Sequence, residues 1–471
     1  MNSVAFKSMF REYDVRGRVS EEELNEKSVA IITKAFAAFL LKRNITKVVV
    51  GYDNRSCSPA FAEAAIESFV SSGLEVYDVG LSLSPVVYFA QYYYKCEGCM
   101  MITASHNPDG WSGFKLGSGY SMTLGTEEIK ELYDILVKEE FVIGKAGTRK
   151  KVDVKDAYVE SVVSRIKLNP NKKLKIVIDA GNGGAGLFAY EIFQKLGCVT
   201  FQLNCDPDTS YPHYFPNPSD LKARKRLREM VIHQYIGADI GIGFDGDGDR
   251  IGVIDEQGDN VWSDKVLIIL SKQLLDKKKK AKIVFDVKCT QALCEVIEEN
   301  GGIPVMWKTG HSFIKSKMKE ENADLAGERS GHIFVGGDDY YGFDDAIFVA
   351  AKLLEYMSYS TDTLSGILKQ FPQYITSPEI KTQCEDSVKY GIVDKLVEEF
   401  KKEYGDRVID INGARVVFDD GWGLVRASSN LPELVIIFEA KTEARLKEIR
   451  SIFREKISKY SEVSAHWEND I

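Results

Sequence analysis

Three aspartates alternate with two glycines in one short segment of the chain. Residues 239–255 read DIGIGFDGDGDRIGVID, which places Asp245, Asp247 and Asp249 directly before Arg250. Glycine lets the backbone curl, so the three carboxylates can converge. Like charges held this close repel one another unless a cation neutralises them, and a donor set made only of oxygen favours Mg²⁺ or Ca²⁺ over zinc. The segment therefore predicts a metal site, and a cation beside an arginine suits phosphoryl chemistry.

An EF-hand does not explain this pattern. The sixth position counted from Asp245 is Arg250, where an EF-hand loop requires glycine. The apolar residues on both sides of the loop also predict strands rather than helices. A charged surface turn is the remaining alternative to a metal site.

A serine stands beside a histidine in the segment ITASHNPDG, residues 102–110. Ser105 and His106 could suggest an acyl hydrolase, but the two glycines of the G-x-S-x-G nucleophile motif are missing. Adjacent side chains on an extended strand point to opposite faces, so we expect that the two residues need not meet. The acidic loop and its arginine fit phosphate chemistry better than acyl transfer.

Two further polar loops suit the recognition of a sugar phosphate. GERSGH, residues 327–332, is bounded by glycine and can offer donors and acceptors to sugar hydroxyls. RASSNLP, residues 426–432, combines an arginine with small polar side chains, a composition that suits phosphate. The candidate binding residues are Glu328, Ser330, His332, Arg426, Ser428, Ser429 and Asn430. For either loop the alternative is a turn whose polar groups satisfy one another.

Three basic residues are weaker candidates when they are considered one at a time. Arg16 follows Asp14 in FREYDVRG, where ion pairs within a surface turn are the alternative. Lys115 lies in GWSGFKL and His311 in WKTGHSFIK. A lone lysine or histidine in a loop is usually solvated, so neither position indicates a site by itself.

Length and charge restrict the class of protein. The 471 residues are too many for one hydrophobic core, so we expect three or four domains. The net charge of −9 argues against a broad surface for nucleic acid or membrane, so no partner of either kind is expected. No apolar run approaches the roughly 18 residues of a membrane span. Among the eight scattered cysteines only Cys96 and Cys99 form a CxxC pair, so we expect no zinc site, reduced thiols and a cytoplasmic protein.

Three parts of the chain share one plan. Strands are predicted at 47–53, 175–184 and 282–287, and each is followed by an amphipathic helix, a glycine and a second strand. Each part therefore predicts a βαβ unit, and their recurrence suggests three related α/β domains. The last ~100 residues instead predict an antiparallel α+β domain. We place the domains at residues 1–150, 151–256, 257–373 and 374–471.

The loops, in this order, resemble those of the α-D-phosphohexomutase superfamily, most closely its bacterial phosphomannomutase/phosphoglucomutase branch. The resemblance is carried by FREYDVRG, TASHNP, DGDGDR, GERSGH and RASSNLPELVIIFEA. It spans nearly the whole chain, with one key loop in each predicted domain. It implies four domains around a central cleft, the first three mixed α/β domains and the last an α+β domain.

The resemblance also implies a reaction and a set of roles. Ser105 would carry a phosphoryl group, donate it to a hexose monophosphate to give a hexose 1,6-bisphosphate, and receive the other phosphate back. Mg²⁺ would be held by Ser105, Asp245, Asp247 and Asp249. Arg250 would neighbour the phosphoserine, and Arg16, Lys115 and His311 would line the reacting end, where the family draws its acid/base candidates. Glu328, Ser330 and His332 would bind sugar hydroxyls, and the loop from Arg426 to Asn430 would hold the phosphate that does not react.

Some alternatives stay open. A phosphoglucosamine mutase is the nearest, and Arg329 in GERSGH is a weak argument against it. A metal-dependent sugar-phosphate phosphatase and a non-catalytic sugar-phosphate sensor are more distant. Two segments depart from the branch: Ser429 and Asn430 stand where Asn-Thr is common, and LSLSP, residues 81–85, stands where Pro-Thr-Pro is common. We expect a monomer or a weak homodimer.

Overall fold

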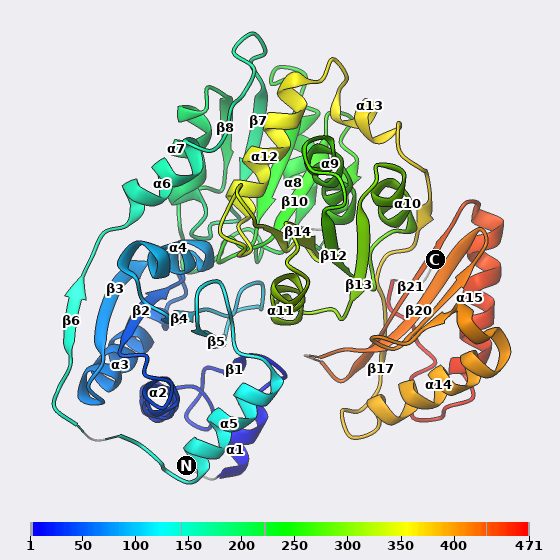
Figure 1. The fold of residues 1–471 in the computed structure, drawn as a ribbon. Helices are drawn as coiled ribbons and strands as arrows, with labels where there is room; N and C mark the ends of the chain where they lie inside the picture. Colours follow the sequence, from blue (N-terminus) through cyan, green and yellow to red (C-terminus); the bar gives the residue numbers. More distant parts are fainter. Residues whose placement is uncertain (1–2, 143, 221–222, 430, 470–471) are drawn as a thin grey trace.

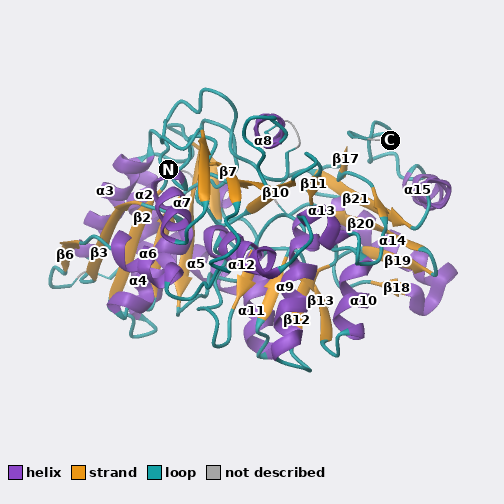
Figure 2. Ribbon diagram, turned by 90° about the horizontal axis from the view of Figure 1, so that it is seen from above, coloured by secondary structure: helices purple, strands orange, loops and turns teal. Residues whose placement is uncertain are grey.

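The computed structural model describes residues 3–142, 144–220, 223–429 and 431–469. Four sheets follow one another along the chain, and Figure 1 shows them in an arc that runs from the blue N-terminal sheet to the orange and red C-terminal one. Figure 2 shows helices flanking the strands of the sheets. None of the helices in the described residues is long and apolar enough to cross a membrane.

The first sheet mixes parallel and antiparallel strands in the order β1-β5-β4-β2-β3-β6, with β5 antiparallel to both of its neighbours. Its strands are β1 (Val15–Arg18), β2 (Lys47–Tyr52), β3 (Glu75–Leu81), β4 (Gly98–Ile102), β5 (Trp111–Ser118) and β6 (Thr148–Lys151). Its helices are α1 (Ser3–Met9), α2 (Glu26–Leu41), α3 (Ser58–Ser71), α4 (Ser84–Tyr94) and α5 (Thr126–Val137).

The second and third sheets repeat the plan with fewer strands. The second has the order β11-β10-β9-β7-β8 and the third β13-β12-β14-β15. The second is built from α6 (Lys155–Val163), β7 (Lys175–Asp179), α7 (Gly186–Lys195), β8 (Val199–Leu203), α8 (Arg224–Val231), β9 (Ile240–Phe244), β10 (Ile251–Asp255) and β11 (Asn260–Val261). The third is built from α9 (Ser263–Lys277), β12 (Lys282–Asp286), α10 (Gln291–Glu299), β13 (Ile303–Trp307), α11 (His311–Glu321), β14 (Leu325–Gly327), β15 (Ile333–Val335), α12 (Ala346–Tyr359) and α13 (Leu364–Leu368).

The fourth sheet is antiparallel, with the order β16-β21-β20-β19-β18 and β17 also paired to β21. Its elements are β16 (Ile375–Thr376), β17 (Ile380–Gln383), α14 (Lys389–Tyr404), the 3-10 helix η1 (Gly405–Arg407), β18 (Val408–Ile409), β19 (Ala414–Phe418), β20 (Gly421–Ala427), β21 (Glu433–Ala440) and α15 (Glu443–Ile457). The predicted α+β character of this domain is confirmed, although β16 and β17 were not predicted.

The three predicted βαβ units are also confirmed. The pairs β2 with β3, β7 with β8, and β12 with β13 are parallel, with α3, α7 and α10 as their crossovers. Gly73, Gly197 and Gly301 follow these helices with φ angles of +95°, +90° and +77°, which glycine adopts without strain. The strand β11 follows residue 256, where we expected the third domain to begin, yet it pairs with β10 of the second sheet.

Helix α4 joins the first domain to the next two. Its residues from Ser84 to Gln91 are buried, as expected for a helix that packs on all sides. The residues from Val86 to Ala90 belong to one apolar cluster that also contains Ile176 of β7 and Phe285 of β12. The N-terminus of α4 meets the acidic loop, where the N–H of Ser84 donates to the carbonyl oxygen of Asp247 at 2.9 Å.

Alternation along β20 gives the fourth sheet two different faces. Val425 packs under α14 and α15, whereas Trp422 and Leu424 face Val287 of the third domain. Side chains two residues apart on a strand share a face. Arg426 therefore lies on the face that meets the third domain.

A buried arginine binds the face of the fourth sheet that carries Trp422 to the third domain. Arg415 donates to the carbonyl oxygen of Val287 at 2.6 Å and to that of Cys289 at 2.9 Å. Its guanidinium also lies over the ring of Trp422, 3.8 Å from the ring centre. Backbone groups of the third domain thus position the fourth sheet.

We expect Glu439→Ala to weaken this junction. Glu439 accepts a hydrogen bond from the indole N–H of Trp422 at 2.7 Å and another from the backbone N–H of Gln291 at 2.8 Å. The buried indole N–H and the partly buried N–H of Gln291 would both lose their partner, so the free energy of unfolding should fall by about 2–4 kcal/mol. Denaturant titration followed by tryptophan fluorescence measures the loss. Glu448→Ala, on the exposed side of α15, is the control and should change stability by less than about 0.5 kcal/mol; equal losses in the two variants would contradict the role of Glu439.

Candidate active site

A cavity of about 500 Å³ lies where residues of all four domains meet. Each domain contributes a cationic side chain to its wall: Arg16, Arg250, Lys288 and Arg426. A basic cavity within a chain of net charge −9 suits an anionic ligand. The predicted site residues that line it are Arg16, Arg250, His311, Glu328, Ser330, His332, Arg426, Ser428 and Ser429. Asn430 lies outside the described residues.

The serine loop follows β4 and leaves the extended conformation at Ser105. The φ angle of Ser105 is +49°, in the left-handed region, and its N–H donates to Oγ1 of Thr103 at 2.8 Å. Its hydroxyl donates to Oδ2 of Asp245 at 2.7 Å. The fold therefore brings the serine to the acidic loop, 140 residues further along the chain.

The expectation that Ser105 and His106 need not meet is wrong. Nδ1 of His106 lies 3.2 Å from the hydroxyl oxygen of Ser105, because the left-handed turn at Ser105 removes the alternation of an extended strand. Burial and the charge of Arg250 hold the pKa of His106 well below its ordinary value, so the ring is neutral. The serine hydroxyl nevertheless has a carboxylate acceptor in Asp245, so the contact does not restore a Ser-His hydrolase pair.

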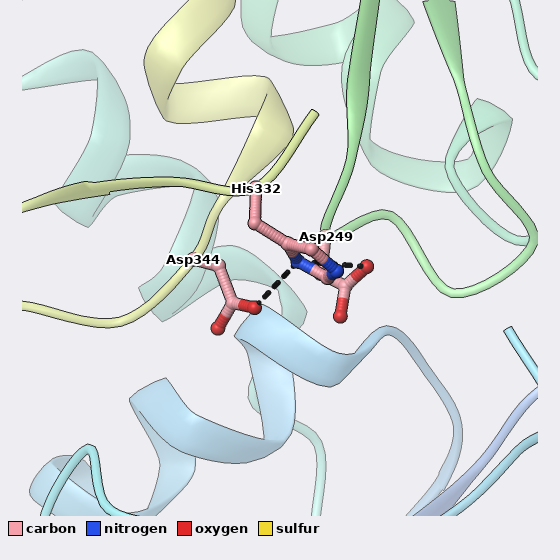
Figure 3. A group of neighbouring side chains, drawn as sticks. All are labelled: Asp249, His332 and Asp344. Atoms are coloured by element: carbon pink, nitrogen blue, oxygen red, sulfur yellow. Dashed lines mark ion pairs between the residues drawn. The ribbon is translucent and has the colours of Figure 1, made fainter. Parts of the chain in front are cut away.

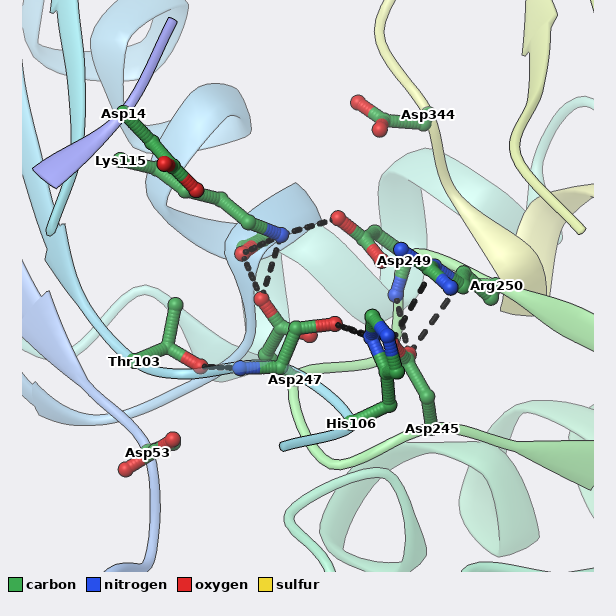
Figure 4. A network of polar contacts seen from close by, with 12 residues as sticks. Asp14, Asp53, Thr103, His106, Lys115, Asp245, Asp247, Asp249, Arg250 and Asp344 are labelled. Atoms are coloured by element: carbon green, nitrogen blue, oxygen red, sulfur yellow. Dashed lines mark hydrogen bonds and ion pairs between the residues drawn. The ribbon is translucent and has the colours of Figure 1, made fainter. Parts of the chain in front are cut away.

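The three aspartates occupy the turn between the antiparallel strands β9 and β10, and all three are completely buried. Oδ1 of Asp245 accepts hydrogen bonds from the backbone N–H of Asp249 at 3.1 Å and of Arg250 at 3.2 Å. The turn thus curls around its first carboxylate. Figure 4 shows the three carboxylates close together, with Lys115 on one side and Arg250 on the other.

Lys115 is not the solvated loop residue that its sequence context suggests. It lies on β5, is buried, and donates to Oδ2 of Asp247 at 2.6 Å and to Oδ2 of Asp249. Burial lowers the pKa of Lys115, but the two aspartates more than offset this and hold that pKa above its ordinary value. Ser84, from the LSLSP segment, donates to the same oxygen of Asp247 at 2.6 Å. Lys115 is therefore a fixed positive charge against the acidic loop.

The acidic loop retains oxygens for a cation. Oδ1 of Asp247 and Oδ1 of Asp249 are buried without a hydrogen-bond partner, and a buried polar atom of this kind needs one. Burial and the charges of the other two aspartates raise the pKa of Asp245 well above its ordinary value, and a cation would relieve this repulsion. Carboxylate oxygens of the three residues lie within 4.8 Å of one another. This donor set fits a hard divalent ion.

A second group, Asp249, His332 and Asp344, also brings three candidate ligand atoms together (Figure 3). The N–H at Nε of Arg250 donates to Nε2 of His332 at 2.9 Å. Because Nε2 accepts this hydrogen bond, the ring proton lies on Nδ1, which faces Oδ2 of Asp344 at 2.8 Å. A protonated ring nitrogen cannot bind a metal, so this group orients His332 and the acidic loop is the better candidate for the ion.

His311 and Glu328 form one wall of the cavity. His311 is the first residue of α11 and is buried, with the ring of Tyr13 packed edge-on at 5.1 Å between ring centres. Burial and the charge of Lys315 hold the pKa of His311 well below its ordinary value. Glu328 accepts a hydrogen bond from the N–H of Gly310 at 2.6 Å, and burial raises its pKa. A neutral base and a carboxyl group of raised pKa thus face the same space.

Arg16 connects the start of the chain to the serine loop. It pairs with Asp14 at 2.8 Å, so the expected ion pair within the turn exists, but the pair is buried. Its second guanidinium nitrogen donates to Oδ1 of Asn107 at 2.7 Å. Arg16 is therefore held beside the serine loop with part of its guanidinium exposed to the cavity.

The fourth domain supplies the far end of the cavity. Arg426 donates to Oδ1 of Asn412 at 2.9 Å and to Oγ of Ser429 at 3.3 Å. Lys288 and Lys381 line the same region, paired with Glu379 at 2.8 Å and Glu433 at 3.3 Å. Neither lysine was predicted, because each stands alone in an ordinary strand or loop sequence.

Arg329 of the GERSGH loop points away from the cavity. Its guanidinium pairs with Asp264 at 3.2 Å and lies over the ring of Trp262, 4.8 Å from the ring centre. The side chain does not line the cavity. Arg329 is therefore not placed to distinguish a hexose from a glucosamine substrate by direct contact.

Comparison with known proteins places these features in a family. The phosphoglucomutase/phosphomannomutase alpha/beta/alpha domains I, II and III match residues 7–143, 156–258 and 262–374, and the C-terminal domain of the same family matches residues 379–456. A phosphomannomutase/phosphoglucomutase of Pseudomonas putida is 39% identical over 451 residues, which cover 96% of this chain and 95% of the relative. A phosphoglucomutase of Neisseria meningitidis is 39% identical over 452 residues, 95% and 96% of the two chains.

A solved structure agrees with these matches. The crystal structure of a phosphoglucomutase/phosphomannomutase family protein from Burkholderia thailandensis superposes with a TM-score of 0.89 at 36% sequence identity, over 96% of this chain and 97% of that one. The superposition covers nearly the whole of both chains, so the two proteins share the overall fold. The chain therefore belongs to the phosphoglucomutase/phosphomannomutase family.

Proposed function

We propose that the protein is a phosphohexomutase that interconverts the 1-phosphate and the 6-phosphate of mannose, glucose or both. The reaction would pass through a phosphoserine at Ser105 and a hexose 1,6-bisphosphate. The observation that carries this proposal is the hydrogen bond of 2.7 Å from Ser105 to Asp245, which joins a nucleophile to a buried acidic loop beside a basic cavity. The names of the relatives from Pseudomonas and Neisseria support the choice of sugars.

Ser105, Asp245, Asp247 and Asp249 would hold Mg²⁺, which would neutralise charge on the phosphoryl group during transfer. The buried, unpartnered oxygens of Asp247 and Asp249 support this assignment. Lys115 would add a fixed positive charge beside the carboxylates, and Arg250 would face the transferred group from the cavity. Charge arranged in advance at a buried site lowers the barrier to phosphoryl transfer.

His311 is our choice for the group that takes the proton from the attacking sugar hydroxyl. It lines the cavity, and its lowered pKa keeps the ring neutral at pH 7 and able to accept a proton. Lys115 is held as an ammonium ion, which has no lone pair to accept the proton. Arg16 would orient the reacting end through its contact with Asn107 of the serine loop.

Cations from the first domain and from the fourth line the cavity, which suits a molecule with a phosphate at each end. Glu328, Ser330 and His332 would hold the sugar hydroxyls, and Arg426, Ser428, Ser429 and Asn430 would hold the phosphate that does not react. Lys288 and Lys381 would add positive charge at that end. Either phosphate of the 1,6-bisphosphate could then face Ser105 after the intermediate turns over within the cavity. A cytoplasmic location and a monomeric or weakly dimeric state stay predictions from the sequence.

A substrate panel tests the reaction. With Mg²⁺ and a trace of hexose 1,6-bisphosphate, we expect turnover of mannose 1-phosphate, glucose 1-phosphate or both. Ser105→Ala should lower kcat by about 10³-fold or more, because the phosphoryl carrier is lost. Intact mass should show one phosphoryl group gained by the parent protein after bisphosphate treatment.

The control for this variant is Ser68→Ala, a buried serine on α3 that should leave kcat unchanged. Faster turnover of glucosamine 6-phosphate than of either hexose would assign the protein to the aminosugar branch. Release of inorganic phosphate equal to the substrate consumed would make it a phosphatase. Retention of activity in Ser105→Ala within a few-fold of the parent would remove the nucleophile role.

We expect Asp247→Asn to raise the Mg²⁺ concentration for half-maximal activity by about ten-fold and to lower kcat, because a charged ligand becomes neutral. The metal titration is measured by activity and, independently, by calorimetry of Mg²⁺ binding. Asp255→Asn, at the other end of β10, is the matched control and should titrate like the parent. Identical titrations for Asp247→Asn and the parent would exclude this loop as the metal site.

Asp344→Asn should lower kcat by roughly ten- to a hundred-fold, because small losses of orientation in a reacting site are costly. Asp344 pairs with Nδ1 of His332 (Figure 3). Nε2 of His332 in turn accepts from Arg250. Steady-state kinetics in both directions measure the loss. Asp338→Asn, exposed in the same segment, is the control. Parental kinetics in Asp344→Asn would show that His332 keeps its orientation without this partner.

A further inference from the structure

One buried arginine holds the loop that carries Ser105. Arg55 lies three residues beyond the end of β2 and is 4% exposed. It donates to three backbone carbonyl oxygens of the serine loop, those of Ser105 at 3.0 Å, Asn107 at 2.6 Å and Pro108 at 3.1 Å, and to that of Trp111, at the start of β5, at 3.2 Å. All four contacts come from the two terminal nitrogens of a single guanidinium.

The remaining N–H of this guanidinium is also used. Nε of Arg55 donates to Oδ2 of Asp53 at 3.2 Å, and Oδ1 of Asp53 accepts from the hydroxyl of Ser58 at 2.6 Å. The carboxylate both neutralises the buried charge and fixes the plane of the guanidinium. A planar group with five donors can meet this set of acceptors, whereas the compact ammonium group of lysine cannot.

Other backbone hydrogen bonds hold the two ends of the serine loop and the turn from Ala104 to Asn107, but they do not reach the carbonyl oxygen of Ser105. Residues 103–110 belong to no helix or strand, and Ser105 holds a φ angle of +49°, which is unfavourable for a residue with a side chain. A conformation of this kind persists only when its surroundings fix it. The bond from Arg55 to the carbonyl oxygen of Ser105 acts directly on the strained residue.

The segment that carries Arg55 is itself anchored to the second domain. The side-chain amide of Asn54 donates to the carbonyl oxygen of Asn182 at 2.8 Å, and its oxygen accepts from the hydroxyl of Tyr211 at 2.9 Å. The acidic loop belongs to the same domain. Residues 53–55 therefore set the position of the serine loop relative to the domain that supplies Asp245.

We propose that Arg55 is a positioning residue for phosphoryl transfer: it fixes the backbone of the serine loop so that the hydroxyl of Ser105 stays against Asp245. The inference rests on the proposed function, because it takes Ser105 as the nucleophile. Arg55 does not line the cavity, so it acts through the loop and not on the substrate. The four carbonyl oxygens that it binds also carry partial negative charge, which the guanidinium balances next to the site that an anionic phosphoryl group enters.

The effects of Arg55→Lys on kcat and on KM distinguish a positioning role from a substrate contact. The variant keeps the positive charge and loses the fork of donors, so kcat should fall by about a hundred-fold while KM for the hexose phosphate changes by less than about three-fold. The rate of Ser105 phosphorylation by hexose 1,6-bisphosphate, followed by intact mass, should fall by the same factor as kcat. Arg149→Lys is the matched control, because Arg149 makes three contacts to Glu63 and Asp78 in the same domain and lies outside the cavity.

Amide hydrogen exchange gives a readout that does not depend on activity. Residues 103–111 should exchange faster in Arg55→Lys than in the parent and in Arg149→Lys, while the rest of the first domain is unchanged. Unchanged exchange in this segment, or kcat within about three-fold of the parent, would overturn the inference. So would a rise in KM with kcat unchanged, since that pattern indicates a substrate contact.

A second variant covers the case in which Arg55→Lys does not fold. Asp53→Asn leaves the four carbonyl contacts available and weakens the carboxylate that orients the guanidinium through Nε, so it should show a smaller fall in kcat with KM unchanged. Parental kinetics in Asp53→Asn together with an unchanged exchange rate at 103–111 would overturn the inference. If the parent protein turns over no hexose phosphate, the proposed function fails, and the exchange experiment alone then decides whether Arg55 holds the loop.

Discussion

The burial of three carboxylates in one turn is the constraint on which the rest of this structure depends. Asp245, Asp247 and Asp249 are completely removed from solvent, and like charges in such a place are tolerated only with compensating partners. The fold supplies a lysine from the first sheet, a serine hydroxyl from the start of α4 and the nucleophile from the serine loop. All three partners come from the first domain. Their contacts with the carboxylates therefore hold the first and second domains together.

The negative charge of the acidic loop also explains why the site needs residues from several domains. An acidic turn at the end of two strands can bind a cation, but it repels an anionic substrate. The cavity beside it is instead lined by Arg16, Arg250, Lys288 and Arg426, one from each domain. These cations are themselves paired or hydrogen-bonded, which keeps them in place before a ligand arrives. The result is a basic cavity in an acidic protein, and the three buried aspartates do not line it.

Apolar packing positions the first three domains, and polar contacts position the fourth. Helix α4 and the apolar cluster around it fix the first three domains to one another. The fourth domain has its own core and meets the third through Arg415, Trp422 and Glu439. Polar junctions depend on direction as well as distance, so they set the orientation of the sheet that presents Arg426 to the cavity.

Local sequence patterns were enough to locate the secondary structure and the candidate loops. Hydrophobic periodicity and glycine stops located the three βαβ units and the antiparallel C-terminal domain, because these signals depend on neighbours within a few residues. The candidate loops could be found for the same reason, since DGDGDR and GERSGH each keep their polar residues together. Which of these residues come into contact could be seen only once the chain was folded. Lys115 lies 134 residues from Asp249, Ser84 lies 163 from Asp247, and Arg55 lies 50 from Ser105, and no local pattern records such contacts. The contact between Ser105 and His106 was misjudged although the two are adjacent, because the left-handed backbone at Ser105 is imposed by hydrogen bonds from elsewhere in the fold.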